Sequence, residues 1–255
     1  MVVEKKKIVL LPPMGHSEDF FDLLIEALGD QFTIHTLNYP VVENNGCSSI
    51  IDEYVSYFSS ELANIKGNFI LGGLSLGATL SLRIKENLGD KITGIVLMAS
   101  GGLKVARARK EMVQHHVASI TCHETFIGKA LSLDSLDNFL LHFNNDNAEV
   151  IAREYFLNYL KTRWSGNFDK DLGQNFVKAA DEAVEINYEK LLAKYQHEIH
   201  LLWGMKDRIF SQRHLIRFKK LMPDAHFHNL NNCGHYLPLE SPGECAKILR
   251  NLCKL

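Results

Sequence analysis

The chain has 255 residues, a hydrophobic fraction of 46% and a charged fraction of 23%, which are typical of a globular protein with a substantial core. Its formal net charge of −2 gives no overall attraction to nucleic acid or to an anionic membrane, and no apolar run approaches the ~20 residues of a membrane span. The five cysteines include no C-x-x-C pair, so we expect reduced thiols, a cytoplasmic protein and no metal site.

Short apolar runs alternate with helical patterns along most of the chain. The predicted strands are residues 8–11, 32–37, 69–71, 92–98, 199–203 and 225–230. Most of these runs are continuously apolar, which is typical of a parallel sheet covered on both faces. The last run alternates polar and apolar residues and therefore suits an edge strand.

Helical patterns separate the predicted strands. They cover residues 17–30, 48–67, 76–90, 211–224 and 241–255, with Ser17 as the expected cap of the first helix. Strands and helices in alternation predict an α/β domain with right-handed crossovers and a mostly parallel sheet of about six strands, with helices on both faces.

Residues 101–194 break this alternation, because they carry helical patterns and no convincing strand. We expect them to form a helical lid inserted into a core made of residues 1–100 and 195–255. The lid is rich in large apolar side chains, most of which are expected to form the core between its helices, whereas some would roof an apolar acyl pocket above Ser75. The candidate pocket residues are Phe126, Phe143, Tyr159 and Trp164.

The lid also begins with a basic stretch. Lys104, Arg107 and Lys110 are spaced three residues apart and are predicted to share one face of a helix. Such a face is either solvated or a docking surface for an acidic macromolecule. The sequence leaves both interpretations open.

The motif Gly73-Leu74-Ser75-Leu76-Gly77 fits the pattern G-x-S-x-G and lies between a predicted strand and a predicted helix. Glycines on both sides of a serine allow a sharp turn that presents the hydroxyl above the sheet. A serine nucleophile needs a base, and His235 follows the last predicted strand. His16, near the end of the first strand, is the alternative base.

A histidine base in turn needs a partner that fixes its tautomer. Asp207 follows the strand at residues 199–203 and is therefore expected at the same sheet edge as Ser75 and His235. The corresponding loop after residues 92–98 reads "ASGGL" and contains no acid, so Asp207 has no local competitor.

The order Ser75, Asp207, His235 resembles the α/β-hydrolase superfamily along nearly the whole chain, through "GLSLGA", "WGMKD" and "NNCGHYLPLESP". The resemblance implies the α/β-hydrolase fold, a Ser-His-Asp triad and no cofactor. It also implies an oxyanion hole made by the backbone N–H groups of Met14 and Leu76. Pro12 and Pro13 replace the His-Gly pair usual in the family, and the prolines can supply rigidity instead.

Size, lid and residue order further resemble the pimeloyl carrier-protein methyl ester esterases of biotin synthesis. This implies an ester or thioester of a short to medium acyl chain as substrate, on a small molecule or on an acyl carrier protein docked at the basic lid face. A carbon–carbon hydrolase or a menaquinone-pathway lyase with the same triad is one alternative. A non-catalytic ligand-binding protein on this fold is another.

Overall fold

The computed structural model describes residues 5–43, 49–105 and 170–252, with residues 110, 154 and 158. In these ranges, six strands form one sheet: β1 (Lys6–Leu11), β2 (Phe32–Thr36), β3 (Phe69–Leu74), β4 (Ile92–Met98), β5 (Ile199–Gly204) and β6 (His226–Leu230). Their order is β2-β1-β3-β4-β5-β6, and all neighbouring pairs are parallel. The predicted sheet is confirmed, including the edge position of the last strand.

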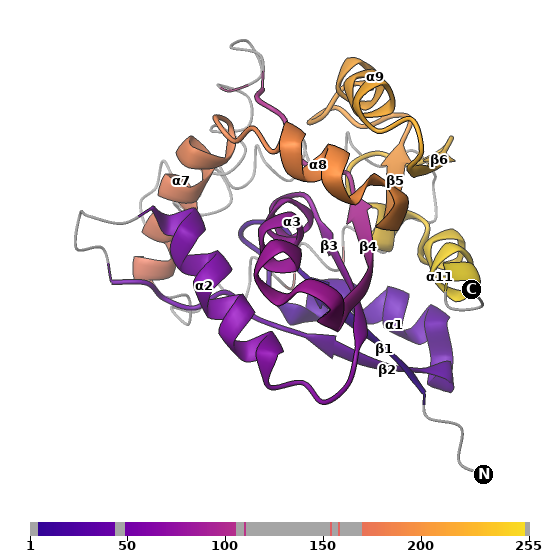
Figure 1. Cartoon of the computed structure of the whole chain (residues 1–255), viewed down its shortest axis with the longest axis horizontal. Helices are drawn as coiled ribbons and strands as arrows, with labels where there is room; N and C mark the ends of the chain where they lie inside the picture. Colours follow the sequence, from indigo (N-terminus) through magenta and orange to yellow (C-terminus); the bar gives the residue numbers. More distant parts are fainter. Residues whose placement is uncertain are drawn as a thin grey trace.

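Helices cover both faces of the sheet (Figure 1). One face carries α1 (Asp22–Leu28), α10 (Leu237–Glu240) and α11 (Pro242–Leu252). The other carries α2 (Ile50–Ala63), α3 (Leu76–Leu88), α7 (Lys170–Ala183), α8 (Glu189–Tyr195) and α9 (Gln212–Leu221). Short 3-10 turns occupy Glu18–Phe21, Gly29–Gln31, Gly89–Lys91 and Gln196–Glu198. No helix in the described ranges is long and apolar enough to cross a membrane.

The continuously apolar strands supply both cores at once. In β1, Val9 and Leu11 pack with the α2 and α3 face, whereas Ile8 and Leu10 pack with the α1 and α11 face. Successive strand residues point to opposite faces, so a strand covered on both sides needs apolar residues at every position. This explains why the central runs of the sequence do not alternate.

The segment predicted as a lid contains α7 and all of α8 except its last residue, and both helices contribute to the core. Glu182 of α7 accepts hydrogen bonds from the hydroxyl of Ser49 and from the N–H groups of Ile50 and Ile51, and so caps the first turn of α2. Asn175 of α7 is buried and makes two hydrogen bonds to the backbone of Val42. The lid boundaries at residues 101 and 194 stay a prediction.

The start of the first helix differs from its prediction. Ser17 does not cap the helix, because its hydroxyl bonds to the carboxylate of Asp19 and not to a backbone N–H. A 3-10 turn precedes α1 as a result. The predicted end near Gly29 is confirmed, and this residue has a φ of 64°.

The winding of the chain changes direction at the carboxyl ends of β1 and β3. These two strands are neighbours although β2 lies between them in sequence, so the strand order reverses direction there. Open parallel sheets bind their ligands at such a switch point. Ser75 follows β3 and Met14 lies shortly after β1, which puts both at this place.

Candidate active site

Ser75 lies in a tight turn between β3 and α3. Its φ of 55° and ψ of −111° place a non-glycine residue in a strained conformation. The turn is held by the Ser75 N–H, which donates to the carbonyl of Met98 at 2.9 Å. Strain of this kind persists only where the surrounding structure imposes it.

Gly73 and Gly77 permit this turn because a side chain at either position would collide with backbone. A Cβ at Gly77 would lie 2.2 Å from the carbonyl oxygen of Leu11, at the end of β1. A Cβ at Gly73 would lie 2.5 Å from the carbonyl carbon of Gly77. Gly77 therefore lets the first turn of α3 pack directly against the end of β1, and Gly73 lets the same turn lie against the end of β3.

The loop after β1 is fixed by a turn and by a tyrosine. The N–H of His16 donates to the carbonyl of Pro13 at 3.2 Å, with Gly15 at a φ of 81°, as a type II turn requires. The hydroxyl of Tyr39 donates to the carbonyl of Pro12 at 2.8 Å. The Met14 side chain is buried, and its N–H is not the donor of the turn hydrogen bond.

Leu76 is the first residue of α3, directly after Ser75. The first N–H groups of a helix have no partner within the helix, and they lie at the positive end of its dipole. The residues predicted as oxyanion donors thus follow two neighbouring strands, Met14 after β1 and Leu76 after β3. Their role as donors stays a prediction.

Asp207 and His235 are brought together by the loops that follow β5 and β6. Nδ1 of His235 lies 2.9 Å from Oδ2 of Asp207, and both side chains are almost fully buried. The other oxygen, Oδ1, accepts from the N–H groups of Ile209 and Phe210. Because a carboxylate only accepts, the tautomer of a neutral imidazole that fits this contact has its proton on Nδ1 and its lone pair on Nε2.

His16, the alternative base, is also buried near this edge. Its ring packs against the rings of Phe20 and Tyr236, at centroid distances of 5.1 and 5.7 Å. The hydrogen bond of Asp207 to an imidazole goes to His235. The geometry therefore favours His235 over His16 as the histidine that Asp207 orients.

Glu240 is a buried carboxyl group beside His235 that the sequence did not reveal. It accepts from the N–H groups of Gly234 and Tyr236, and its side chain is shielded from solvent. Burial, with a smaller contribution from the charge of Asp207, raises its pKa to about 8, although the two N–H donors and Lys206 act in the opposite direction. In the string "LPLESP" this residue looks like an ordinary surface acid.

The other predicted site residues are only partly placed. Lys104 lies outside any helix, contrary to the predicted basic helix face, and both Lys104 and Lys110 form ion pairs with Glu185. Arg107 lies outside the described residues. The candidate pocket residues also lie outside them, namely Phe126, Phe143, Tyr159 and Trp164.

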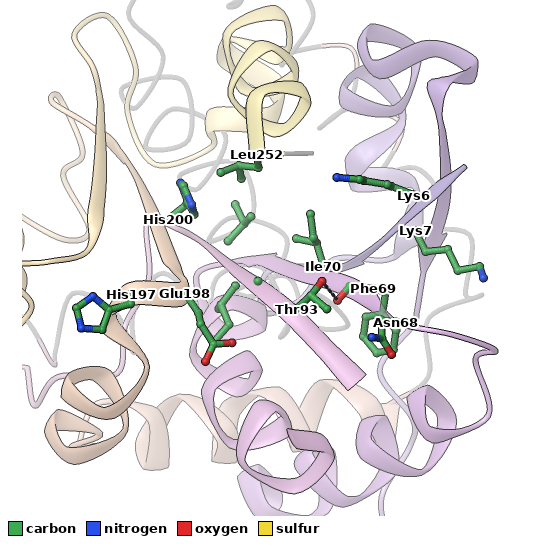
Figure 2. A pocket seen from close by; sticks show the side chains of 13 residues that line it. Lys6, Lys7, Asn68, Phe69, Ile70, Thr93, His197, Glu198, His200 and Leu252 are labelled. Carbon is green, nitrogen blue, oxygen red and sulfur yellow. Dashed lines mark hydrogen bonds between the residues drawn. The ribbon is translucent and has the colours of Figure 1, made fainter. Parts of the chain in front are cut away.

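A cavity of about 530 Å³ lies at the opposite edge of the sheet, near the amino ends of the strands (Figure 2). Its lining includes Lys6, Ile70, His200 and Leu252. None of the triad candidates lines it. Because ligands of parallel sheets bind at the carboxyl ends of strands, this cavity is separate from the candidate active site.

Three histidines stack at the β5–β6 edge. The ring of His200 lies 4.2 Å from that of His226, and its Nδ1 lies 3.1 Å from Nε2 of His228. Burial, followed by the proximity of the other two rings, lowers the pKa of His200 to about 3, so this ring is neutral at neutral pH. Within the described part of the chain, no group of three or more His, Cys, Asp or Glu side chains is arranged to hold a metal ion.

Comparison with known families agrees with the observed fold. The Alpha/beta hydrolase family model matches residues 8–248, and the chain belongs to that family. No curated protein sequence matches the chain significantly.

Several solved structures share the fold at low sequence identity. A thermophilic esterase from Thermogutta terrifontis has a TM-score of 0.73 at 16% identity, over 98% of this chain and 89% of that one. A structure from a study of carboxylesterases of the thaumarchaeon Nitrososphaera gargenis has a TM-score of 0.74 at 17% identity, over 98% and 90%. The α/β-hydrolase enzyme MGS-M2, from a deep-sea metagenome of the Medee basin, has a TM-score of 0.76 at 12% identity, over 100% and 91%.

The contact between Gly77 and Leu11 predicts a sharp difference between two glycine substitutions. Gly77→Ala should destabilise the protein by ~3 kcal/mol or more, because a new methyl group would overlap a backbone carbonyl. Gly94→Ala is the matched control, since its Cβ would only reach ordinary contact at 3.8 Å from Ile70. Urea denaturation of both variants measures the difference, and equal stability of the two would contradict the contact.

The raised pKa of Glu240 predicts a pH-dependent cost to stability. Between the ordinary pKa of a glutamate and about 8, the folded protein holds a proton that the unfolded chain has released. Stability should therefore fall as pH rises through this window, by at most ~1.4 kcal/mol per pH unit from this group. Glu240→Gln cannot titrate, so the difference in unfolding free energy between the variant and the wild type should shift in favour of the variant as pH rises from 5 to 8. Parallel stability curves for the two proteins would show that Glu240 does not titrate there.

Proposed function

We propose that this protein is a serine hydrolase that cleaves carboxylic esters through an acyl-enzyme intermediate. The observation that carries the proposal is the buried Asp207–His235 pair at the same sheet edge as the strained turn of Ser75. A nucleophile, a base and a group that orients the base are the parts that this chemistry requires. The family membership and the names of the esterase neighbours support the same reaction class.

In the proposed first half-reaction, the hydroxyl oxygen of Ser75 attacks the ester carbonyl while Nε2 of His235 takes its proton. The resulting tetrahedral oxyanion collapses, the bond to the alcohol oxygen breaks, and His235 returns the proton to the leaving alcohol. In the second half-reaction, water attacks the acyl-enzyme with His235 as base. The products are the acid and the free serine.

Asp207 has a positioning and electrostatic role in this proposal. Its Oδ1 is held by two backbone N–H groups, so the carboxylate is fixed before it meets the imidazole. Oδ2 then keeps the proton of His235 on Nδ1 and stabilises the imidazolium that forms during the reaction.

The N–H groups of Met14 and Leu76 would bind the oxyanion. Each donor of this kind contributes ~3 kcal/mol to transition-state stabilisation. The rigid turn after β1 supports this role, because preorganised donors need no rearrangement when charge develops. The prolines before Met14 add rigidity without removing its N–H.

For the substrate, we propose a short to medium acyl chain in an apolar pocket beneath the lid. A thioester can follow the same steps, since only the leaving group changes. The arginine that follows the Ser75 turn most closely, Arg83, lies two helical turns further along α3, where it pairs with Asp52 of α2 and is partly exposed. This position favours ester hydrolysis over a lyase reaction, which would need an arginine close to the nucleophile to hold a substrate carboxylate.

Docking of an acyl carrier protein on the basic lid face stays a prediction. Glu185 pairs with both Lys104 and Lys110, which reduces the net positive charge of that face. A carrier-linked ester that reacts no faster than the same free methyl ester would contradict carrier docking.

Removal of Ser75 or His235 should almost abolish ester hydrolysis. We expect Ser75→Ala and His235→Ala to reduce kcat/KM by a factor on the order of 10⁴ or more, and the double variant to be little worse, because the residues act as one unit. Hydrolysis of p-nitrophenyl butyrate measures this. Ser56→Ala, an exposed site on α2, is the control for a serine substitution that should leave the rate unchanged. Normal activity in Ser75→Ala would refute the proposed nucleophile.

A closed apolar pocket predicts an optimum in acyl length. Each methylene that becomes buried contributes ~0.8 kcal/mol, so kcat/KM should rise a few-fold per carbon until the pocket is full and then fall. A series of p-nitrophenyl esters from acetate to palmitate measures the profile. A rate that keeps rising to the longest chain would indicate an open groove instead.

A further inference from the structure

Two carboxyl groups bracket His235 from different sides. Asp207 binds the imidazole ring, whereas Glu240 binds the backbone of the loop that carries the ring. Oε2 of Glu240 accepts from the N–H of Gly234 at 2.6 Å, and Oε1 accepts from the N–H of Tyr236 at 2.9 Å. One carboxyl group therefore binds the N–H groups of the residues before and after the histidine.

The loop between β6 and α10 has little regular structure of its own, so these contacts matter for its shape. On one side, the N–H of Lys206 donates to the carbonyl of Cys233 at 2.9 Å. On the other side, Glu240 reaches back from α10, and its own N–H donates to the carbonyl of Tyr236. The loop is thus fixed to the end of β5 and to α10 at once.

Burial of Glu240 costs free energy, which makes its position informative. Its side chain is about 3% exposed, and a buried carboxyl group is unfavourable unless hydrogen bonds satisfy it. The titratable and charged groups around it are Lys206, Asp207, Cys233, Glu244 and Cys245. The two N–H groups beside the histidine satisfy both of its oxygens.

We propose that Glu240 is a positioning residue for His235, which fixes the backbone on both sides of the base and thereby holds its ring against Asp207. The inference rests on the proposed function only where His235 is described as the base. The hydrogen bonds of Glu240 go to the backbone on either side of His235, whereas the ring of His235 is bound by Asp207. Its effect on catalysis is therefore indirect, through the place at which Nε2 is held.

The substitution Glu240→Gln tests this role with almost no change in shape. The amide oxygen can still accept one N–H, but the amide nitrogen has no lone pair for the other and would face a second donor. This holds whether the wild-type carboxyl group is protonated or ionised, because both of its oxygens carry lone pairs. Glu244→Gln is the matched control, since Glu244 is an exposed acid of α11.

The first readout is the kinetics of p-nitrophenyl butyrate hydrolysis. We expect Glu240→Gln to lower kcat by ~10- to 100-fold with little change in KM, because displacement of a catalytic group by about 1 Å costs a factor on that order. Glu244→Gln should match the wild type. Equal kcat values for wild type and Glu240→Gln would overturn the proposal.

The second readout is the proton NMR signal of Nδ1–H of His235, which does not depend on activity. In the wild type and in Glu244→Gln, the hydrogen bond to Asp207 should give a sharp downfield resonance. In folded Glu240→Gln, this resonance should shift upfield and exchange faster with water. A variant that loses kcat but keeps the resonance unchanged would overturn the positioning role.

Two further results distinguish failure of the proposed function from failure of the positioning role of Glu240. If the wild type hydrolyses no ester, the proposed function fails, and the NMR comparison still decides the role of Glu240. If Glu240→Gln does not fold, amide exchange in the wild type decides it instead. Slow exchange at Gly234 and Tyr236 supports the two hydrogen bonds, and exchange as fast as in an unbonded loop would overturn them.

Discussion

The candidate active site depends on the close approach between the first turn of α3 and the end of β1. Gly77 lies against the carbonyl of Leu11, where any side chain would overlap the backbone. This contact holds the strained Ser75 turn beside the loop of Met14, and it brings the proposed nucleophile and one proposed oxyanion donor to the same edge of the sheet. The parallel register of β1 and β3 extends the contact into the sheet.

A second constraint governs the histidine side of the site. Asp207 and Glu240 are both buried, and backbone N–H groups bind their carboxyl oxygens. Two N–H groups bind Oδ1 of Asp207, and one N–H group binds each oxygen of Glu240. Asp207 uses its remaining oxygen for the imidazole, whereas Glu240 uses both oxygens on the loop. A buried carboxyl group thus fixes the imidazole ring of His235 in the case of Asp207, and the backbone that carries this ring in the case of Glu240. The raised pKa of Glu240 reflects the burial that this arrangement requires.

Much of this arrangement follows from the sequence by simple rules. Continuously apolar runs predicted a sheet buried on both faces, and the alternating run of β6 predicted an edge. Asp207 and His235 were predicted to meet because parallel strands end at one sheet edge, and the structure brings them into contact. Each of these inferences uses local pattern together with one topological rule.

Other features depend on tertiary contacts that no local pattern encodes. Glu240 follows a proline and a leucine and precedes a serine and a proline, so nothing in its neighbours indicates that it is buried. Lys104 and Lys110 were predicted as a cationic helix face, yet Lys104 lies outside a helix and both pair with Glu185, 75 or more positions away. Ser17 has the right residue type for a helix cap, but its hydroxyl bonds to Asp19 instead. The propensity of a residue type indicates which hydrogen bonds it can form, but the tertiary structure determines which of these partners lie within reach.

The most direct test of the central claim is covalent labelling of the proposed nucleophile. A fluorophosphonate reacts with a serine that is activated by a neighbouring histidine, and it forms a stable adduct on the hydroxyl oxygen. Intact-mass analysis followed by peptide mapping should find one adduct, on Ser75, and the adduct should be lost in His235→Ala. No adduct on the wild-type protein, or an adduct on a serine other than Ser75, would contradict the account.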